Sequence, residues 1–412
     1  MPQLWPTQEV NPNSLRHFVE LVVLVLQDDH PADTLRGSLE LPRPAFRFVQ
    51  AVGAANFSFL FFNRTMSSSV NNTSRQPQPV AYSMLELAIV SQGTTLQQTL
   101  HHSLALAQAA EELGYKRFWL AEHHNSDNVG SSATSLLIGY VAENTTRIRV
   151  GSGGIMLPNH SPLLVAEQFG TLAQLYPGRI DLGLGRAAGT DGQTAQAIRS
   201  DFMQAAHSFP QEIGKIQTYF SSANRQAAVR APVAEGTDVP LYILGSSTDS
   251  AHLAAQLGLP YAFASHFAST HLLNALRIYR AEFTPSDVLQ QPYVIVALNA
   301  FVADTDEEAQ QLFTSLIRMF VGLLTGNTRA PIQPPTAMTE ELQEMWEHPA
   351  VQQMLKYSFV GSKQTVKQQL QAFLAETGAN ELITASTMYA PEDRLKSARL
   401  FAEIMAELNE GR

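Results

Sequence analysis

The sequence has no cysteine and few charged residues for its length. Because none of the 412 residues is a cysteine, disulfide bonds, thiolate metal sites and a cysteine nucleophile are excluded. This composition is compatible with a reducing compartment, and we expect a cytoplasmic protein. Charged residues make up 16% of the chain and hydrophobic residues 45%. Such a composition is typical of a globular protein with a large buried core.

The sequence also lacks long apolar runs and an excess of positive charge. No stretch reaches the length of about 20 apolar residues that spans a membrane. The apolar stretches at residues 18–26 and 57–62 are short, and neither has the flanks of a signal peptide. The net charge of −10 repels nucleic acid and anionic membranes. We therefore predict that neither is a partner.

Residues 1–83 differ in composition from the remainder. They contain no lysine, and they end in the polar run SSSVNNTSRQPQP at residues 67–79. Such a run is typical of a linker. We interpret residues 1–83 as a poorly ordered upstream extension or the product of a mis-assigned start codon, followed by one domain over residues 84–412.

Strand and helix patterns alternate along residues 84–412. Short apolar segments predict eight strands, and each is followed by a helical pattern. These strands are apolar throughout, which predicts a parallel sheet covered on both faces, and eight such units favour a closed (β/α)₈ barrel. We expect an insertion at about residues 325–378, between the seventh and eighth strands, to form a mobile cover. The predicted strands are 85–90, 117–121, 148–154, 179–185, 240–245, 260–264, 292–303 and 381–386.

The carboxyl ends of barrel strands are where the chemistry of this fold lies. Polar residues follow several of the predicted strands, and histidines follow three of them. Several histidines around one barrel mouth favour a functional site over a purely structural role. The candidates are Glu122, His123, His124, His160, Arg186, Ser246, Ser247, Ser250 and His266.

Two common ligand motifs are disfavoured. Neighbouring side chains on a strand point to opposite sides, so His123 and His124 do not both face one metal ion, and no metal site is predicted. The run GLGRAA at residues 183–188 fits a dinucleotide-binding pattern, but it lies in the fourth repeat rather than the first. We interpret it as a tight turn where the backbone approaches a ligand.

The segment from Gly245 to Ser250 has two interpretations. It opens a helix after a strand. Backbone N–H groups and hydroxyls at such a position can bind a phosphate, but serine, threonine and aspartate are also ordinary helix caps. Both interpretations stay open at this point.

The runs FWLAEHHN, GSGGIMLPNHSPLLVAEQFGTL and YPGRIDLGLGRAAGTD resemble those of the luciferase-like flavin-dependent monooxygenases. The resemblance extends over about residues 84–408 and is closest to the single-chain branch with undefined substrates. It implies a (β/α)₈ barrel that uses reduced FMN, supplied by a separate reductase, and molecular oxygen to oxidise a small organic substrate. It also implies a homodimer that pairs through helices beside the second and third strands.

The resemblance implies a role for particular residues. His123 matches the catalytic histidine, and Glu122 matches the acid that precedes it. Gly153 and Gly154 match a non-prolyl cis peptide under the flavin ring. The family's ligands of the flavin phosphate are matched by Arg186, Ser247 and Ser250.

The chain also departs from luciferase. Gly185 stands where luciferase has a reactive cysteine, and Ser246 stands where it has a phosphate-side glutamate, so light emission from an aldehyde is not implied. Two alternatives stay open. One is a deazaflavin-dependent hydride transferase on the same barrel, and the other is a flavin-binding protein without turnover.

Overall fold

Eight parallel strands close into a barrel in the part of the chain that the computed structural model describes, residues 78–325 and 330–410. The ring closes where β9 pairs in parallel with both β7 and β1, and the predicted (β/α)₈ fold is confirmed. The barrel strands are β1 (Ala81–Glu86), β2 (Arg117–Leu120), β3 (Arg149–Met156), β4 (Ile180–Gly185), β5 (Leu241–Gly245), β6 (Tyr261–Phe263), β7 (Val294–Ala303) and β9 (Glu381–Ala385).

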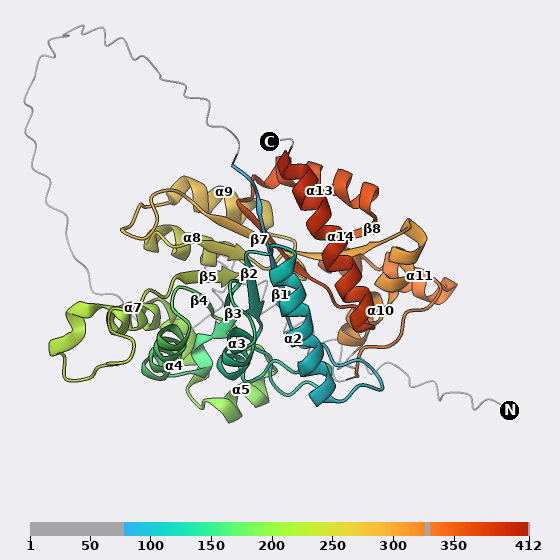
Figure 1. Ribbon diagram of the computed structural model, residues 1–412. Helices are drawn as coiled ribbons and strands as arrows, with labels where there is room; N and C mark the ends of the chain where they lie inside the picture. Colours follow the sequence, from blue (N-terminus) through green and yellow to red (C-terminus); the bar gives the residue numbers. More distant parts are fainter. Residues whose placement is uncertain (1–77, 326–329, 411–412) are drawn as a thin grey trace, which may run out of the picture.

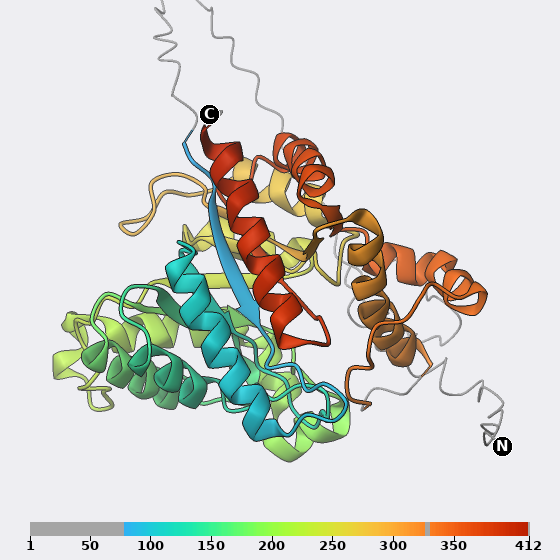
Figure 2. The same ribbon diagram turned by 45° about the vertical axis from the view of Figure 1, so that its right-hand side comes forward.

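Helices surround this barrel, and α2 and α14 lie along β1 (Figures 1 and 2). Their ends follow ordinary capping rules: Thr95 and Gln98 form a capping box at the start of α2. Among the described helices, none combines the length and apolarity needed to cross a membrane. The helices are α2 (Leu96–Glu112), α3 (Thr134–Glu143), α4 (Pro162–Leu175), α5 (Gly192–Ile198), α6 (Phe202–His207), α7 (Phe209–Phe220), α8 (Thr248–Leu257), α9 (Leu272–Glu282), α10 (Asp306–Leu324), α11 (Glu340–Glu347), α12 (Pro349–Met354), α13 (Lys363–Thr377) and α14 (Pro391–Glu410).

The first strand begins earlier than predicted. It spans Ala81–Glu86 rather than 85–90. It also ends earlier than predicted, because Ala88 has a positive φ of 53° that interrupts the extended backbone. The start of β1 is also tied to the last helix, since the Val80 N–H donates to Asn409 Oδ1 at 2.8 Å. A chain starting at Met84 would therefore lose half of β1. Residues 1–77, which make up most of the predicted extension, lie outside the described residues.

The insertion contains regular structure rather than a simple loop. It carries α11, α12 and a ninth strand, β8 (Ser358–Ser362), which pairs with the carboxyl half of β7 at the end of the sheet order. The sequence prediction missed β8 because the strand is short and only alternate residues are buried. A second hydrophobic core, which includes Phe301, Phe313 and Leu342, packs the insertion against α10.

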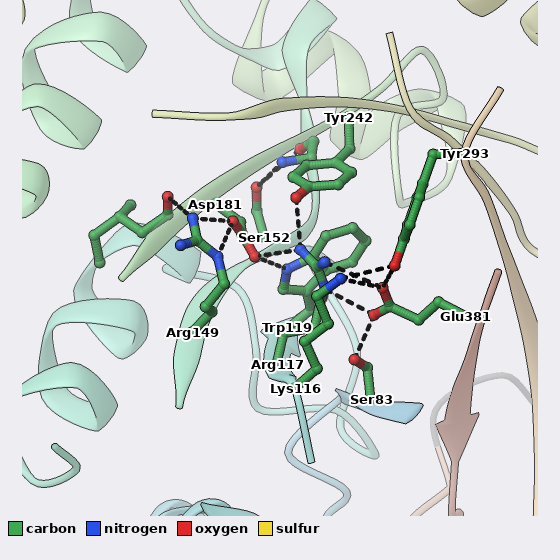
Figure 3. Close-up of polar contacts among 12 residues, drawn as sticks. Ser83, Lys116, Arg117, Trp119, Arg149, Ser152, Asp181, Tyr242, Tyr293 and Glu381 are labelled. Atoms are coloured by element: carbon green, nitrogen blue, oxygen red, sulfur yellow. Dashed lines mark hydrogen bonds and ion pairs between the residues drawn. The ribbon is translucent and has the colours of Figure 1, made fainter. Parts of the chain in front are cut away.

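The sequence suggested that the strands are apolar throughout, and this prediction is wrong. Three charged side chains, each at most 2% exposed, meet inside the barrel at the amino ends of the strands (Figure 3). The Arg117 guanidinium donates to Asp181 Oδ2 and to Glu381 Oε1, both at 2.7 Å, and to the Tyr242 hydroxyl at 2.7 Å. Trp119 Nε1 also donates to Asp181, at 3.0 Å. The partly exposed Arg149 and Lys116 extend this network by pairing with Asp181 and Glu381. The network lies at the barrel end associated with stability rather than catalysis.

Candidate active site

The Glu122 carboxylate is the centre of a hydrogen-bond network at the carboxyl ends of the strands. It is 1% exposed and lies two residues after the end of β2. Its oxygens accept from His124 Nε2, Asn159 Nδ2 and His160 Nε2, each at 2.9 Å, and from the Met156 N–H at 2.9 Å. Glu122 therefore joins the loops after β2 and β3.

These hydrogen bonds fix the ionisation of Glu122. Burial alone would raise its pKa, but hydrogen bonds from His124, His160 and Asn159 outweigh that effect and lower the pKa to about 2. The carboxylate is charged at neutral pH and its oxygens are already occupied by donors. This geometry suits a residue that positions its neighbours.

His123 has a different environment from its neighbour His124. Its Nδ1 lies 3.3 Å from the Gly189 carbonyl, and because a carbonyl only accepts, Nδ1 carries the proton. The Nε2 atom of the neutral ring then holds a lone pair. Burial lowers the pKa of His123 below 6.5, although Gly189 and Glu122 act in the opposite direction. A neutral, half-buried imidazole of this kind can accept a proton at pH 7.

His266 contributes a second imidazole from the end of β6. Its Nδ1 is buried without a hydrogen-bond partner among the described residues. The Asn299 amide holds its backbone by donating to the His266 carbonyl at 2.6 Å. Burial, and then the nearby His123, lower the pKa of His266 to about 3. The ring is thus neutral throughout the physiological range.

Glycines allow strands β3 and β4 to approach each other at this end. The Gly153–Gly154 peptide is cis, which confirms the expectation from the resemblance. A Cβ at Gly154 would lie 2.9 Å from the Gly183 carbonyl, and one at Gly183 would lie 2.2 Å from the Ser152 carbonyl. At Gly183 the close approach is therefore to a neighbouring strand, not to a ligand as the sequence suggested.

The predicted phosphate ligands lie around the start of α8. The Ser247 side chain makes no capping hydrogen bond, and the Ser250 hydroxyl donates to the Ser247 carbonyl at 2.7 Å. Arg186, from the end of β4, lies 3.5 Å from Asp249 in the first turn of α8. An exposed ion pair of this length contributes little free energy. The uncapped N–H groups and the arginine fit an anion such as a phosphate.

The structure thus places the predicted residues in two groups at the carboxyl end of the barrel. Glu122 and His123 lie with the loops after β2 to β4, while Arg186 lies against the start of α8. The partners of Glu122 were not predicted, because Asn159 and His160 are 37 and 38 residues away in sequence. Among residues 78–325 and 330–410, no three acidic or histidine side chains are arranged to hold a metal ion.

Comparisons with known proteins show what this chain is similar to. The family model described as luciferase-like monooxygenase matches residues 80–381. A protein named luciferase-like monooxygenase from Escherichia coli strain K12 is 46% identical over 329 residues, covering 80% of this chain and 98% of the relative. The N-acetyl-S-alkylcysteine monooxygenase of Bacillus subtilis strain 168 is 36% identical over 242 residues, covering 57% of this chain and 72% of the relative.

A solved structure, that of apo-MsnO8, is also similar. It is 34% identical in sequence and superimposes with a TM-score of 0.72, covering 79% of this chain and 98% of that chain. The segment matched by the family model, residues 80–381, includes Glu122 and His123. The chain belongs to the luciferase-like monooxygenase family.

Proposed function

We propose that this protein is an FMN-dependent monooxygenase that transfers one oxygen atom from O₂ to a small organic substrate. The observation that carries the proposal is the neutral His123, whose Nδ1 is fixed by Gly189 and whose Nε2 is left to accept a proton. Family membership supports the reaction class. We further propose that a separate cytoplasmic reductase supplies the reduced FMN.

The residues fit FMN in two respects. The N–H groups at the start of α8, the Ser247 hydroxyl and Arg186 would hold the phosphate. The cis Gly153–Gly154 peptide would present backbone alone to the flavin ring, while the absent Cβ atoms leave room for the neighbouring strands. Reduced FMN supplies the reaction with O₂, and the protein supplies binding, exclusion of water and proton transfer.

Glu122 and His123 have separate roles in this proposal. His123 Nε2 accepts or returns a proton at the reacting centre. Glu122 does not touch the substrate; it fixes the loops that carry His123 and Asn159. The relative that acts on N-acetyl-S-alkylcysteines suggests thioethers bearing a carboxylate as the first substrates to test.

His123→Ala tests the proposal directly. We expect FMN affinity to change by less than about tenfold, or 1.4 kcal/mol, because the phosphate ligands come from other strands. Productive oxidation should fall by about 10²–10⁴, the usual contribution of a positioned acid or base. The measurement is an anaerobic titration with reduced FMN, followed by mixing with O₂ and a thioether panel. His101→Ala, at an exposed position on α2, is the matched control.

The same experiment separates the alternatives. Wild-type turnover in His123→Ala would contradict the role of His123. Tight binding of reduced deazaflavin, with no binding of reduced FMN, would favour the hydride transferase. Bound reduced FMN that reacts with O₂ no differently from free FMN, and oxidises nothing, would favour a flavin-binding protein without turnover.

A further inference from the structure

A small pocket lies over the carboxyl ends of β1 and β2. Its volume is about 170 Å³. Backbone hydrogen bonds place it there: the Ile332 N–H donates to the Val90 carbonyl at 3.0 Å, and the Val90 N–H donates to the Asn128 carbonyl at 3.0 Å. The lining residues are Asn128, Arg318, Met319, Gly322, Leu323, Ala330, Pro331, Ile332 and Gln333.

This position relates the pocket to the candidate active site. Asn128 belongs to the loop that begins with Glu122 and His123, and the His123 N–H donates to the Ser131 carbonyl of the same loop at 3.1 Å. The remaining wall comes from α10 and from the insertion. One loop thus contributes both to the proposed catalytic centre and to the wall of the pocket.

Arg318 brings a positive charge to this pocket without a counter-charge. Its side chain is half-buried, and its Nη1 donates to the Pro334 carbonyl at 3.1 Å. Within residues 78–325 and 330–410, no carboxylate forms an ion pair with it. A guanidinium has five N–H donors, and a partly buried cation is stabilised by an anion that accepts from several of them.

The other walls suit an organic acid rather than an inorganic anion. Asn128 Oδ1 accepts from the Ser126 hydroxyl, which leaves the Asn128 amide N–H₂ for a ligand. Met319, Leu323 and Ile332 supply apolar surface beside these donors. Pockets that enclose a whole ligand usually measure about 300–1,000 Å³. A pocket of 170 Å³ is the size of a subsite for one end of a substrate.

We propose that this pocket binds the carboxylate end of the substrate, with Arg318 as the counter-charge and Asn128 as a second donor. Arg318 is then a specificity-determining residue and not a catalytic one. The inference deepens the proposed function, on which it rests, by assigning the substrate class: small organic acids with an apolar neighbouring group. Neutral esters and amides of the same acids are expected to bind poorly.

The test measures binding of N-acetylmethionine and its primary amide by ligand-observed NMR, with and without saturating FMN. Wild type should bind the acid at least about tenfold more tightly than the amide, a difference of 1.4 kcal/mol. Arg318→Gln should abolish this preference while retaining a donor for the Pro334 carbonyl, and Arg318→Lys should retain part of it. Arg277→Gln, on α9, is the matched control, since Arg277 contacts only Asn274 through its side chain among the described residues.

Each outcome decides the proposal separately from the flavin chemistry. Equal affinity of wild type for acid and amide, or unchanged acid affinity in Arg318→Gln with native circular dichroism, would overturn it. If Arg318→Gln does not fold, Arg318→Lys and Asn128→Ala carry the test, and an unchanged preference in both would overturn it. Acid binding that depends on Arg318, in a protein that does not bind FMN, would support the subsite and contradict the proposed FMN dependence.

Discussion

Glu122 and His123 are adjacent in sequence, yet their environments give them different chemistry. The Glu122 oxygens accept hydrogen bonds from four donor groups, three side chains and one backbone N–H, whereas His123 contacts a single carbonyl through Nδ1. A saturated carboxylate positions the loops around it, and an imidazole with a lone pair left over transfers protons. We therefore propose that positioning and proton transfer are divided between these two neighbouring residues.

Glu122→Gln tests the positioning role at the residue scale. The folded-state pKa of about 2 lies below the ordinary value of 4.5, so the charged group adds stability that is fully present above pH 4.5 and is lost as the pH falls toward 2. The variant should lose about 1.5–3 kcal/mol at pH 7, the usual contribution of hydrogen bonds to a charged group. It should also show a flatter stability profile below pH 4.5. Urea unfolding across this range measures both, and a wild-type profile would contradict the role.

At the scale of elements, we propose that the start of α8 and the end of β4 form one anion-binding corner. The Ser247 side chain does not cap the first turn of α8. Arg186 lies beside this turn, with its Nη1 atom 3.5 Å from Asp249 Oδ2. Helix N-termini attract anions through unpaired N–H groups and the helix dipole. The corner should therefore recognise the phosphate of FMN rather than its ring.

Arg186→Gln tests this assignment by comparing FMN with riboflavin, which lacks the phosphate. Wild type should bind FMN at least about tenfold more tightly than riboflavin, equivalent to 1.4 kcal/mol. The variant should lose most of this preference and leave riboflavin binding unchanged. Fluorescence titration measures the four affinities, with Arg277→Gln as the control. An unchanged preference in Arg186→Gln would exclude the corner as the phosphate site.

At the scale of the whole molecule, the network around Arg117 holds the amino end of the barrel together. Arg117 pairs with both Asp181 and Glu381, which come from opposite parts of the sheet order (Figure 3). Asp181 has a second partner in Arg149 at 2.6 Å, and Glu381 has one in Lys116 at 3.5 Å. Without Arg117, Asp181 would keep Arg149, whereas the buried Glu381 would keep only the longer pair with the partly exposed Lys116 and would be poorly compensated. Arg117→Met should therefore destabilise the fold by about 3–5 kcal/mol, measured by urea unfolding, whereas Arg147→Met on the surface should cost little. A loss below 1 kcal/mol would contradict this account.

The outer surface carries a candidate dimer contact. Leu136 on α3 is 75% exposed and Leu164 on α4 is 55% exposed, and the resemblance places the family's pairing surface beside these elements. We propose a homodimer through this surface, since symmetric pairs are the commonest oligomers. Leu136→Asp should then be monomeric in light scattering at micromolar concentration, and Val288→Asp, at an exposed loop position, should remain dimeric. A monomeric wild type would reject the proposal.

The sequence predicts the order of elements well because each barrel strand and helix has a local periodicity. Boundaries fail where apolar residues continue into a loop, as at Ala88, whose positive φ ends β1. Interactions between distant segments also escape prediction: His160 and Glu122 meet only because β2 and β3 are neighbours. The charged residues that open β2 and β9 gave no sign that they face the barrel interior.

Transfer of isotopically labelled dioxygen tests the central claim most directly. The protein is supplied with FMN, a flavin reductase, NADH and N-acetyl-S-methylcysteine under labelled O₂. The masses of the products are then measured by mass spectrometry. We predict a sulfoxide that carries one labelled oxygen atom in wild type and in His101→Ala, and a yield reduced by about 10²–10⁴ in His123→Ala. Across a panel of small organic acids, products without the label, or oxidation that proceeds equally with and without reduced FMN, would contradict an FMN-dependent monooxygenase.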